Sequence, residues 1–174
     1  MAAKKSNWLI ASLFVISVGL LCSVPQAMAE TLSYKFLIPV TQRQVVQVGD
    51  VPNHWVGIVV REGSATLETG EMAWIKGVAS FDVIKGGGPF VLYSTLTFQD
   101  GSTIITQTKG VSEKHSATGP PEVRSTSEII KGTGRFEGIK GTVSGLTKSM
   151  PLEKGELGEK SLGERTMNYT LPKK

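Results

Sequence analysis

Few side chains in this sequence have the type and spacing that chemistry at a protein site requires. The two histidines, His54 and His115, lie far apart in predicted loops and lack the local spacing of metal ligands, so we expect surface histidines and no metal site. The single cysteine, Cys22, has no partner for a disulfide. Asp50 is a lone carboxylate before a proline, which is typical of a turn residue that accepts backbone hydrogen bonds. The sequence therefore indicates no cofactor.

One group of charged residues is a candidate binding site. Arg124, Thr126 and Glu128 alternate along a predicted strand and therefore share one face. If this face points inward, Arg124 and Glu128 form a polar anchor for a ligand carboxylate or hydroxyl, because unpaired charge in an apolar cavity is costly. If it points outward, they are solvated residues that contribute little to stability, which is the interpretation we favour.

A glycine-rich hairpin follows this strand. We expect Gly132 and Gly134 to adopt positive φ in a tight connection, and Gly138 and Gly141 to leave room for close backbone approach or a bend. A dinucleotide-binding loop requires G-x-G-x-x-G at the start of a helix. Here the third glycine comes one position late and the flanking segments are predicted strands, so we interpret these glycines as structural.

The first 29 residues have the features of a secretory signal peptide. Two lysines form a basic start, an apolar run of 14 residues covers positions 8–21, and small residues occupy positions 27 and 29. A membrane anchor is the alternative, but a span requires about 20 apolar residues. A lipoprotein acylated at Cys22 would need a small residue where Leu21 stands. We therefore predict a signal peptide over residues 1–29, cleaved after Ala29.

Cleavage changes the charge balance of the protein. The full chain carries 19 Lys and Arg against 15 Asp and Glu, and the leader removes two lysines and no acids, which leaves 17 against 15, or +2, and no cysteine. This nearly neutral chain lacks the clustered basic face of a nucleic-acid-binding protein. We expect one domain over residues 30–174, secreted or periplasmic and without a membrane span in the mature form.

The mature sequence alternates between apolar and polar residues with a period of two, the pattern of half-buried β-strands. The pattern is clearest over residues 31–40, 72–84, 90–98, 103–109, 123–130, 135–143 and 165–171. Asp100-Gly101 predicts a two-residue type I′ hairpin turn. Residues 148–164 combine Gly, Glu and Lys without a periodic pattern and are predicted to form a flexible loop.

Because the last predicted strand lies near the C-terminus, we expect it to pair with an early one, which removes the open sheet edges. The expected fold class is all-β, a small closed antiparallel β-barrel of about eight strands, whose interior holds side chains or one small ligand. Trp74 lies on the mixed face of its strand and marks a candidate oligomer contact. The apolar residues that we expect to line the lumen are Tyr34, Phe36, Ile75, Phe81, Leu92, Leu96, Phe98 and Tyr169.

A resemblance to a known family supports this fold. Residues 129–141, IIKGTGRFEGIKG, resemble the Gly-Thr-Gly-Arg-Phe-Glu-Gly hairpin of the allene oxide cyclase and dirigent superfamily. Residues 48–51, VGDV, resemble the Gly-Asp segment after the family's first strand, and residues 96–101, LTFQDG, resemble its central hairpin. The likeness spans about Tyr34 to Tyr169. It implies a small antiparallel barrel, often trimeric, with an elongated apolar cavity for lipid-derived or phenolic molecules.

The resemblance assigns the chemistry of the plant cyclases to an acid and an asparagine on the first barrel strand, and dirigent proteins also rely on acids near the pocket. The corresponding strand here, residues 32–40, contains neither an acid nor an asparagine. We therefore expect an exported barrel that binds a small apolar molecule in its lumen. An allene oxide cyclase-like isomerase and a purely structural envelope protein with a filled barrel are the alternatives, and a homotrimer is what the resemblance implies.

Overall fold

The computed structural model of the chain describes residues 29–112, 122–150 and 153–173. His115 and residues 1–28, which make up nearly all of the predicted signal peptide, lie outside these ranges. No helix in the described ranges is long and apolar enough to cross a membrane. The elements are β1 (Ala29–Ile38), β2 (Val40–Gln47), β3 (His54–Leu67), β4 (Met72–Ile84), β5 (Gly88–Phe98), β6 (Thr103–Ser112), β7 (Glu122–Thr133), the 3-10 helix η1 (Gly134–Phe136), β8 (Lys140–Met150) and β9 (Lys160–Thr170).

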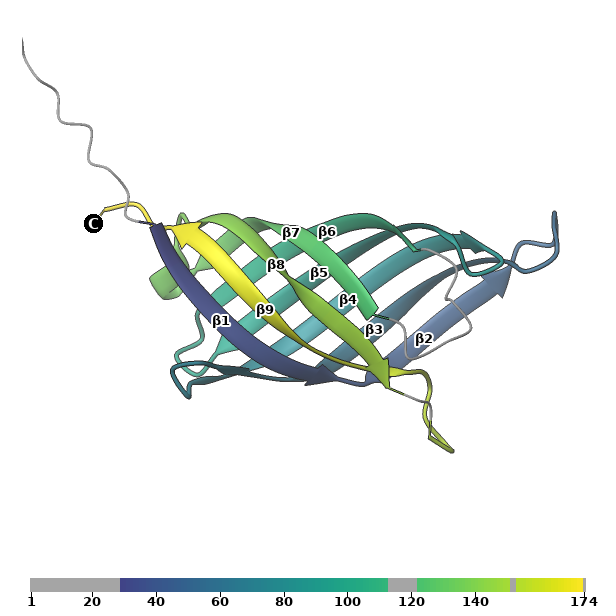
Figure 1. Cartoon of the computed structure of the whole chain (residues 1–174), viewed down its shortest axis with the longest axis horizontal. Coiled ribbons are helices and arrows are strands. Elements are labelled where there is room, and N and C mark those ends of the chain that lie inside the picture. The colour runs from purple at the N-terminus through teal and green to yellow at the C-terminus, as the bar shows by residue number, and fades with distance from the viewer. Residues whose placement is uncertain (1–28, 113–121, 151–152, 174) are drawn as a thin grey trace, which may run out of the picture.

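The strands form a closed antiparallel barrel. Their order is β1-β9-β8-β7-β6-β5-β4-β3-β2, and an additional pairing of β1 with β3 closes the sheet. The C-terminal half of β3 pairs with β1, where Tyr34 lies opposite Leu67, while its N-terminal half pairs with β2. Eight strands therefore surround the interior, and β2 extends beyond them as a ninth (Figure 1). The predicted barrel is confirmed, and so is the pairing of its last strand with its first, in which Ala29 lies opposite Thr170.

The period-two pattern reflects this geometry, because successive side chains on a strand point to opposite faces of a sheet. In β4, Ala73 and Ile75 are buried inside the barrel, whereas Trp74 and Lys76 are exposed outside it. β1 has the same alternation.

The sequence pattern does not identify β2 and β3. Six of the eight residues of β2 are exposed, so neither of its faces carries a continuous apolar row. The inward face of β3 places Arg61 and Gly63 between the buried residues Val59 and Ala65, which interrupts the apolar series. His54 is therefore the first residue of a strand, which corrects the predicted loop.

The hairpin between β5 and β6 differs from the predicted type I′ turn. Gly101 has φ +80°, but Asp100 is not among the residues with positive φ. The Gly101 N–H donates to the Phe98 carbonyl at 3.0 Å, and the Phe98 N–H donates to the Ser102 carbonyl at 2.9 Å. This is the pattern of a type I turn followed by a left-handed glycine. The Asp100 carboxylate stabilises it by accepting from the Ser102 N–H at 2.9 Å.

Two element boundaries in the second half also differ from expectation. The predicted strand over residues 135–143 begins instead with η1, and β8 starts only at Lys140. The predicted loop over residues 148–164 is shorter, because β8 continues to Met150 and β9 starts at Lys160. Alternation is hard to read in these strand ends because small and charged residues dominate both faces.

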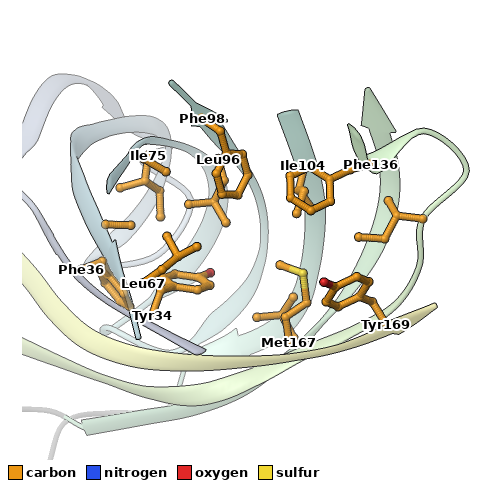
Figure 2. Close-up of a cluster of buried hydrophobic side chains, with 14 of the residues drawn as sticks. Tyr34, Phe36, Leu67, Ile75, Leu96, Phe98, Ile104, Phe136, Met167 and Tyr169 are labelled. Atoms are coloured by element: carbon orange, nitrogen blue, oxygen red, sulfur yellow. The ribbon is translucent and has the colours of Figure 1, made fainter. Parts of the chain in front are cut away.

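One end of the barrel is filled by large side chains. Leu96, Ile104 and Met167 converge there from β5, β6 and β9, and each is at most 2% exposed (Figure 2). Phe136 of η1 packs against Phe98 with ring centroids 4.8 Å apart, so the 3-10 helix contributes to this core. We call this region the packed end.

The outer side of the packed end is held by Arg135. Its guanidinium lies over the rings of Phe98 and Phe136, 4.7 and 4.9 Å from their centroids. The same group donates to the Glu71 carboxylate at 2.7 Å. The Gly-Thr-Gly-Arg-Phe-Glu-Gly hairpin therefore serves to fix η1 against the barrel.

Candidate functional site

The other end of the barrel is hollow. It contains a cavity of about 320 Å³, which we call the lumen. The inward residues of β9 show where the cavity begins: Tyr169 and Met167 belong to the packed end, and Arg165 and Ser161 line the lumen. Arg165 thus lies at the floor of the lumen, next to the packed end.

The lumen has two chemically different walls. One wall comes from β1, β4 and β5 and is mainly apolar. Its side chains are those of Tyr34, Phe36, Ile38, Ile75, Ala79, Phe81, Val83, Phe90 and Leu92. The other wall comes from β6, β7, β8 and β9 and is rich in hydroxyl groups. They belong to Thr106, Thr108, Ser112, Ser125, Ser127, Thr147, Ser149 and Ser161.

The hydroxyl wall is internally hydrogen-bonded in part. Thr108 and Ser127 are both buried, and their hydroxyl oxygens lie 2.6 Å apart. Thr106 is also buried, and its hydroxyl donates to the Ser94 carbonyl at 3.5 Å. Buried polar groups are normally paired in this way. The wall can offer hydrogen bonds to a polar part of a ligand, whereas the opposite wall contributes mainly apolar contact.

Arg165 brings a positive charge to the floor of the lumen. One of its terminal nitrogens, Nη1, donates to the Ser125 hydroxyl at 2.9 Å, and Nη2 donates to the Thr147 hydroxyl at 2.6 Å. The guanidinium also lies 5.7 Å from the centroid of the Phe36 ring. Burial lowers the pKa of Arg165 and raises the pKa of the neighbouring Tyr34 to about 12. The group remains a cation, because arginine does not lose its proton in proteins.

Arg61 brings a second positive charge, from β3. It lies opposite Gly77 of β4, which has no side chain to occupy the lumen at that level. The Nε of Arg61 is inaccessible to solvent and has no hydrogen-bond partner among the described residues. Burial lowers the pKa of Arg61, and the negative charge of Glu159, an exposed residue before β9, opposes this effect.

The structure separates the residues predicted to line the lumen into two groups. Five of them border the cavity: Tyr34, Phe36, Ile75, Phe81 and Leu92. The other three, Leu96, Phe98 and Tyr169, belong to the packed end and do not border it. Both groups lie on inward faces, and the sequence pattern identifies a face without showing at which height the cavity begins.

Arg124 and Glu128 do not reach the lumen. Both are exposed on the outer face of β7, and the lumen is lined instead by Ser125 and Ser127 between them. The inward cations are Arg61 and Arg165, which the sequence analysis does not identify. Arg165 has a visible signal, because it shares the period-two face of Met167 and Tyr169.

The glycines of the hairpin have distinct local roles. Gly134 has φ +60° and Gly138 has φ +75°. Gly132 does not have positive φ, which differs from our expectation. A Cβ on Gly132 would collide with the carbonyl oxygen of Phe136, and one on Gly141 would collide with that of Asn168. These two positions therefore require glycine for close backbone approach.

A second cluster of titratable residues lies outside the lumen. The His54 ring contacts two carboxylates, with Nδ1 2.6 Å from Asp50 Oδ1 and Nε2 2.7 Å from Asp82 Oδ1. The same Asp50 oxygen accepts from the Val51 N–H at 2.8 Å, as expected for a turn residue. The hydrogen bonds to Asp82 and Asp50 raise the pKa of His54, and the hydrogen bond from His54 lowers the pKa of Asp50. This cluster attaches the β2–β3 turn to β4.

The outer surface carries an open groove between β2, β3, β4 and β5. Its apolar residues include Val46, Val56, Ile58 and Val91, and Ser80 lies among them. The groove volume is about 520 Å³, larger than that of the lumen. We nevertheless regard the lumen as the candidate site, because it lies between the barrel strands and combines apolar, hydroxyl and cationic groups.

No known family model and no curated protein matches this chain. Its structure does match those of dirigent proteins. The structure of the pterocarpan synthase dirigent protein GePTS1 aligns over 93% of this chain and 100% of that chain, with a TM-score of 0.54 and 14% identity. The structure of the pterocarpan synthase dirigent protein PsPTS1 aligns over 86% and 99%, with a TM-score of 0.50 and 19% identity. The chain therefore has a dirigent-like barrel fold.

Proposed function

We propose that this protein is an exported binding barrel that holds a small, largely apolar molecule in its lumen. The observation that carries the proposal is the contrast between the two ends of one barrel. Large side chains fill the packed end, and the other end retains a cavity of about 320 Å³ between the strands. Protein interiors are normally close-packed, so a cavity of this size indicates a site for a ligand.

The walls of the lumen support this class of ligand. Aromatic and aliphatic side chains such as Phe36, Phe81 and Leu92 cover one wall. Burial of apolar ligand surface against them provides about 25 cal/mol for each Å² removed from water. A purely structural barrel would need no such space, so the hollow end favours binding over the structural alternative.

The proposal is binding without catalysis. The resemblance to the cyclases assigns their chemistry to an acid on the first barrel strand. Among the described residues that line the lumen there is no aspartate or glutamate, and the side chains that β1 contributes are Tyr34, Phe36 and Ile38. A proton transfer from a carboxyl group has no donor there, which leaves the isomerase alternative without a supporting observation.

Export and assembly belong to the same proposal. The predicted signal peptide implies a secreted or periplasmic protein, which would meet its ligand outside the cytoplasm. Trp74 is 54% exposed on the outer face of β4 and supports an oligomer contact, because aromatic residues are enriched at interfaces. The family resemblance implies a trimer.

Two measurements test the proposed function. Native mass spectrometry of the protein purified from its own host should detect a co-purified small molecule. Binding of the neutral fluorescent probe N-phenyl-1-naphthylamine should be lost in Ala79→Phe, which fills the lumen from β4. The matched control is Ser80→Phe, because the neighbouring side chain points outward into the surface groove. Loss of binding in Ser80→Phe alone would move the site to the groove and refute the proposal.

A further inference from the structure

We propose that the ligand of the lumen carries an anionic group, such as a carboxylate or a sulfonate, and that Arg165 binds this group at the inner part of the cavity. This inference rests on the proposed function and adds the charge of the ligand and its orientation. The apolar body would lie along the wall of β1, β4 and β5, and the anion would enter first.

The first argument is the charge balance of the lumen. Arg165 and Arg61 both line it, and the described lining residues include no acid that would neutralise them. The charge of Glu159 acts on Arg61 from an exposed position before β9. A buried charge without a counter-charge is costly, because the interior solvates ions poorly. An anionic ligand would offset that cost at the place where it arises.

The second argument is that Arg165 is already held in position. The Ser125 and Thr147 hydroxyls accept from its two terminal nitrogens, at 2.9 and 2.6 Å, and Phe36 lies against its face. These partners are neutral, so they orient the guanidinium without neutralising it. A group fixed before binding loses little conformational freedom when the ligand arrives. Charge-assisted hydrogen bonds from such a group are about twice as strong as neutral ones.

The third argument is the incomplete hydrogen bonding of Arg61. Its Nε is shielded from solvent and has no partner among the described residues. Unsatisfied buried donors are rare in folded proteins and indicate a bound water, an ion or a ligand. β3 and β9 both pair with β1, so the two arginines lie on the strands that flank β1. Arg165 lies opposite Tyr34 and Arg61 lies opposite Val40, six residues further along the chain, so Arg61 is further from the packed end and offers its Nε to a second acceptor of the ligand.

The orientation of the ligand follows from the position of Arg165. On β9, the next inward residue toward the closed side is Met167, which is 0% exposed in the packed end. The cation is therefore at the floor. Phe81 and Phe90 line the lumen further from this floor, along β4 and β5. An amphipathic anion binds with its charged group at the floor and its apolar body toward these rings.

A pair of fluorescent probes tests this inference. 1-Anilinonaphthalene-8-sulfonate and N-phenyl-1-naphthylamine share one aromatic skeleton, and only the first carries a sulfonate. In the wild-type protein the anionic probe should bind more tightly. Arg165→Met should weaken binding of the anionic probe by about tenfold or more. The same variant should leave binding of the neutral probe within about threefold. Arg124→Met is the matched control and should change neither affinity, because Arg124 is exposed on the outer face of β7.

The outcomes separate this inference from the proposed function. If Arg165→Met weakens both probes equally, or neither, the anion site is refuted while a lumen that binds the neutral probe still stands. If neither probe binds the wild-type protein, the proposed function itself fails. Ala79→Phe fills the lumen and must abolish binding of both probes. If this variant still binds the anionic probe, that probe binds outside the lumen and the anion site is refuted. If Arg165→Met does not fold, Arg165→Gln carries the same test, because it removes the charge and keeps a polar group beside Ser125 and Thr147.

Discussion

The hollow end of the barrel can be tested through stability, without any ligand. Leu96 and Leu92 are both inward residues of β5, four positions apart on the same strand face. Leu96 is 2% exposed in the packed end, whereas Leu92 borders the lumen. Replacing each by alanine makes the same chemical change in two different surroundings. We expect Leu96→Ala to lower the free energy of unfolding far more than Leu92→Ala.

The expected magnitudes follow from these surroundings. For Leu96, the lost transfer free energy is about 2.4 kcal/mol, at about 0.8 kcal/mol for each carbon group removed. The cavity left in a close-packed region adds about 1 kcal/mol, which gives a total of about 3 to 4 kcal/mol. Leu92 faces an existing cavity and loses contacts on one side only, so we expect about 1 kcal/mol. The difference between the two variants is then about 2 to 3 kcal/mol.

The assay is urea unfolding followed by far-ultraviolet circular dichroism, with the slope of the transition compared between the variants. In a thermal scan the same difference corresponds to roughly 4 to 12 °C in Tm. Equal losses of stability in Leu96→Ala and Leu92→Ala would mean that Leu92 is packed as tightly as Leu96. In that case there is no lumen, and both proposals made above would have no site.

Two further predictions concern the parts that hold the barrel together. His54→Gln should reduce stability most at mildly acidic pH, because the pKa of His54 is raised above 6.5 and that of Asp50 is lowered below 3.8. The His54 contribution is complete below pH 6.5 and is lost as the pH rises through the raised pKa, while the Asp50 contribution is lost as the pH falls below 3.8. The wild-type and variant unfolding curves should therefore differ most between pH 3.8 and 6.5 and converge above the raised pKa of His54. Gly132→Ala should lower the free energy of unfolding by about 2 kcal/mol or more, because the new Cβ would collide with the carbonyl oxygen of Phe136. In Gly101→Ala the new Cβ meets open space, so the variant should lose only about 1 to 2 kcal/mol, for its positive φ. Equal urea midpoints of the two variants would contradict this reasoning.

The fold was predictable because the barrel imposes one simple rule on the sequence. Residues that alternate in β1, β4 and β5 must point alternately inside and outside, and the apolar series in these strands is nearly unbroken. The rule fails for β3, where Arg61 and Gly63 occupy inward positions. It also fails for β2, which belongs to no enclosed face and is therefore not under the same constraint.

The candidate site was predictable only in part, for a related reason. Hydrophobic periodicity identifies inward residues, but the height of each residue along the barrel depends on strand register, which joins residues far apart in the chain. Leu92 and Leu96 therefore look alike in the sequence, although one borders the lumen and the other fills the packed end. The inward charges were missed because an arginine is normally assigned to the surface. Arg165 breaks that rule while sharing a face with Met167 and Tyr169.

The division into a packed and a hollow end is encoded by side-chain size at the inward positions. On β6, the inward residue Ile104 lies in the packed end, and the next two inward residues along the strand, Thr106 and Thr108, line the lumen. The size of the inward side chains also decreases along β9, from Met167 in the packed end to Ser161 at the lumen. Hydroxyl-bearing residues leave more volume than the large apolar residues that would otherwise fill the cylinder, and they require hydrogen-bond partners. Selection for stability alone would favour larger apolar residues at these positions. Their smallness and polarity, together with the inward cation Arg165, are what a barrel needs if its interior is to receive an amphipathic anion.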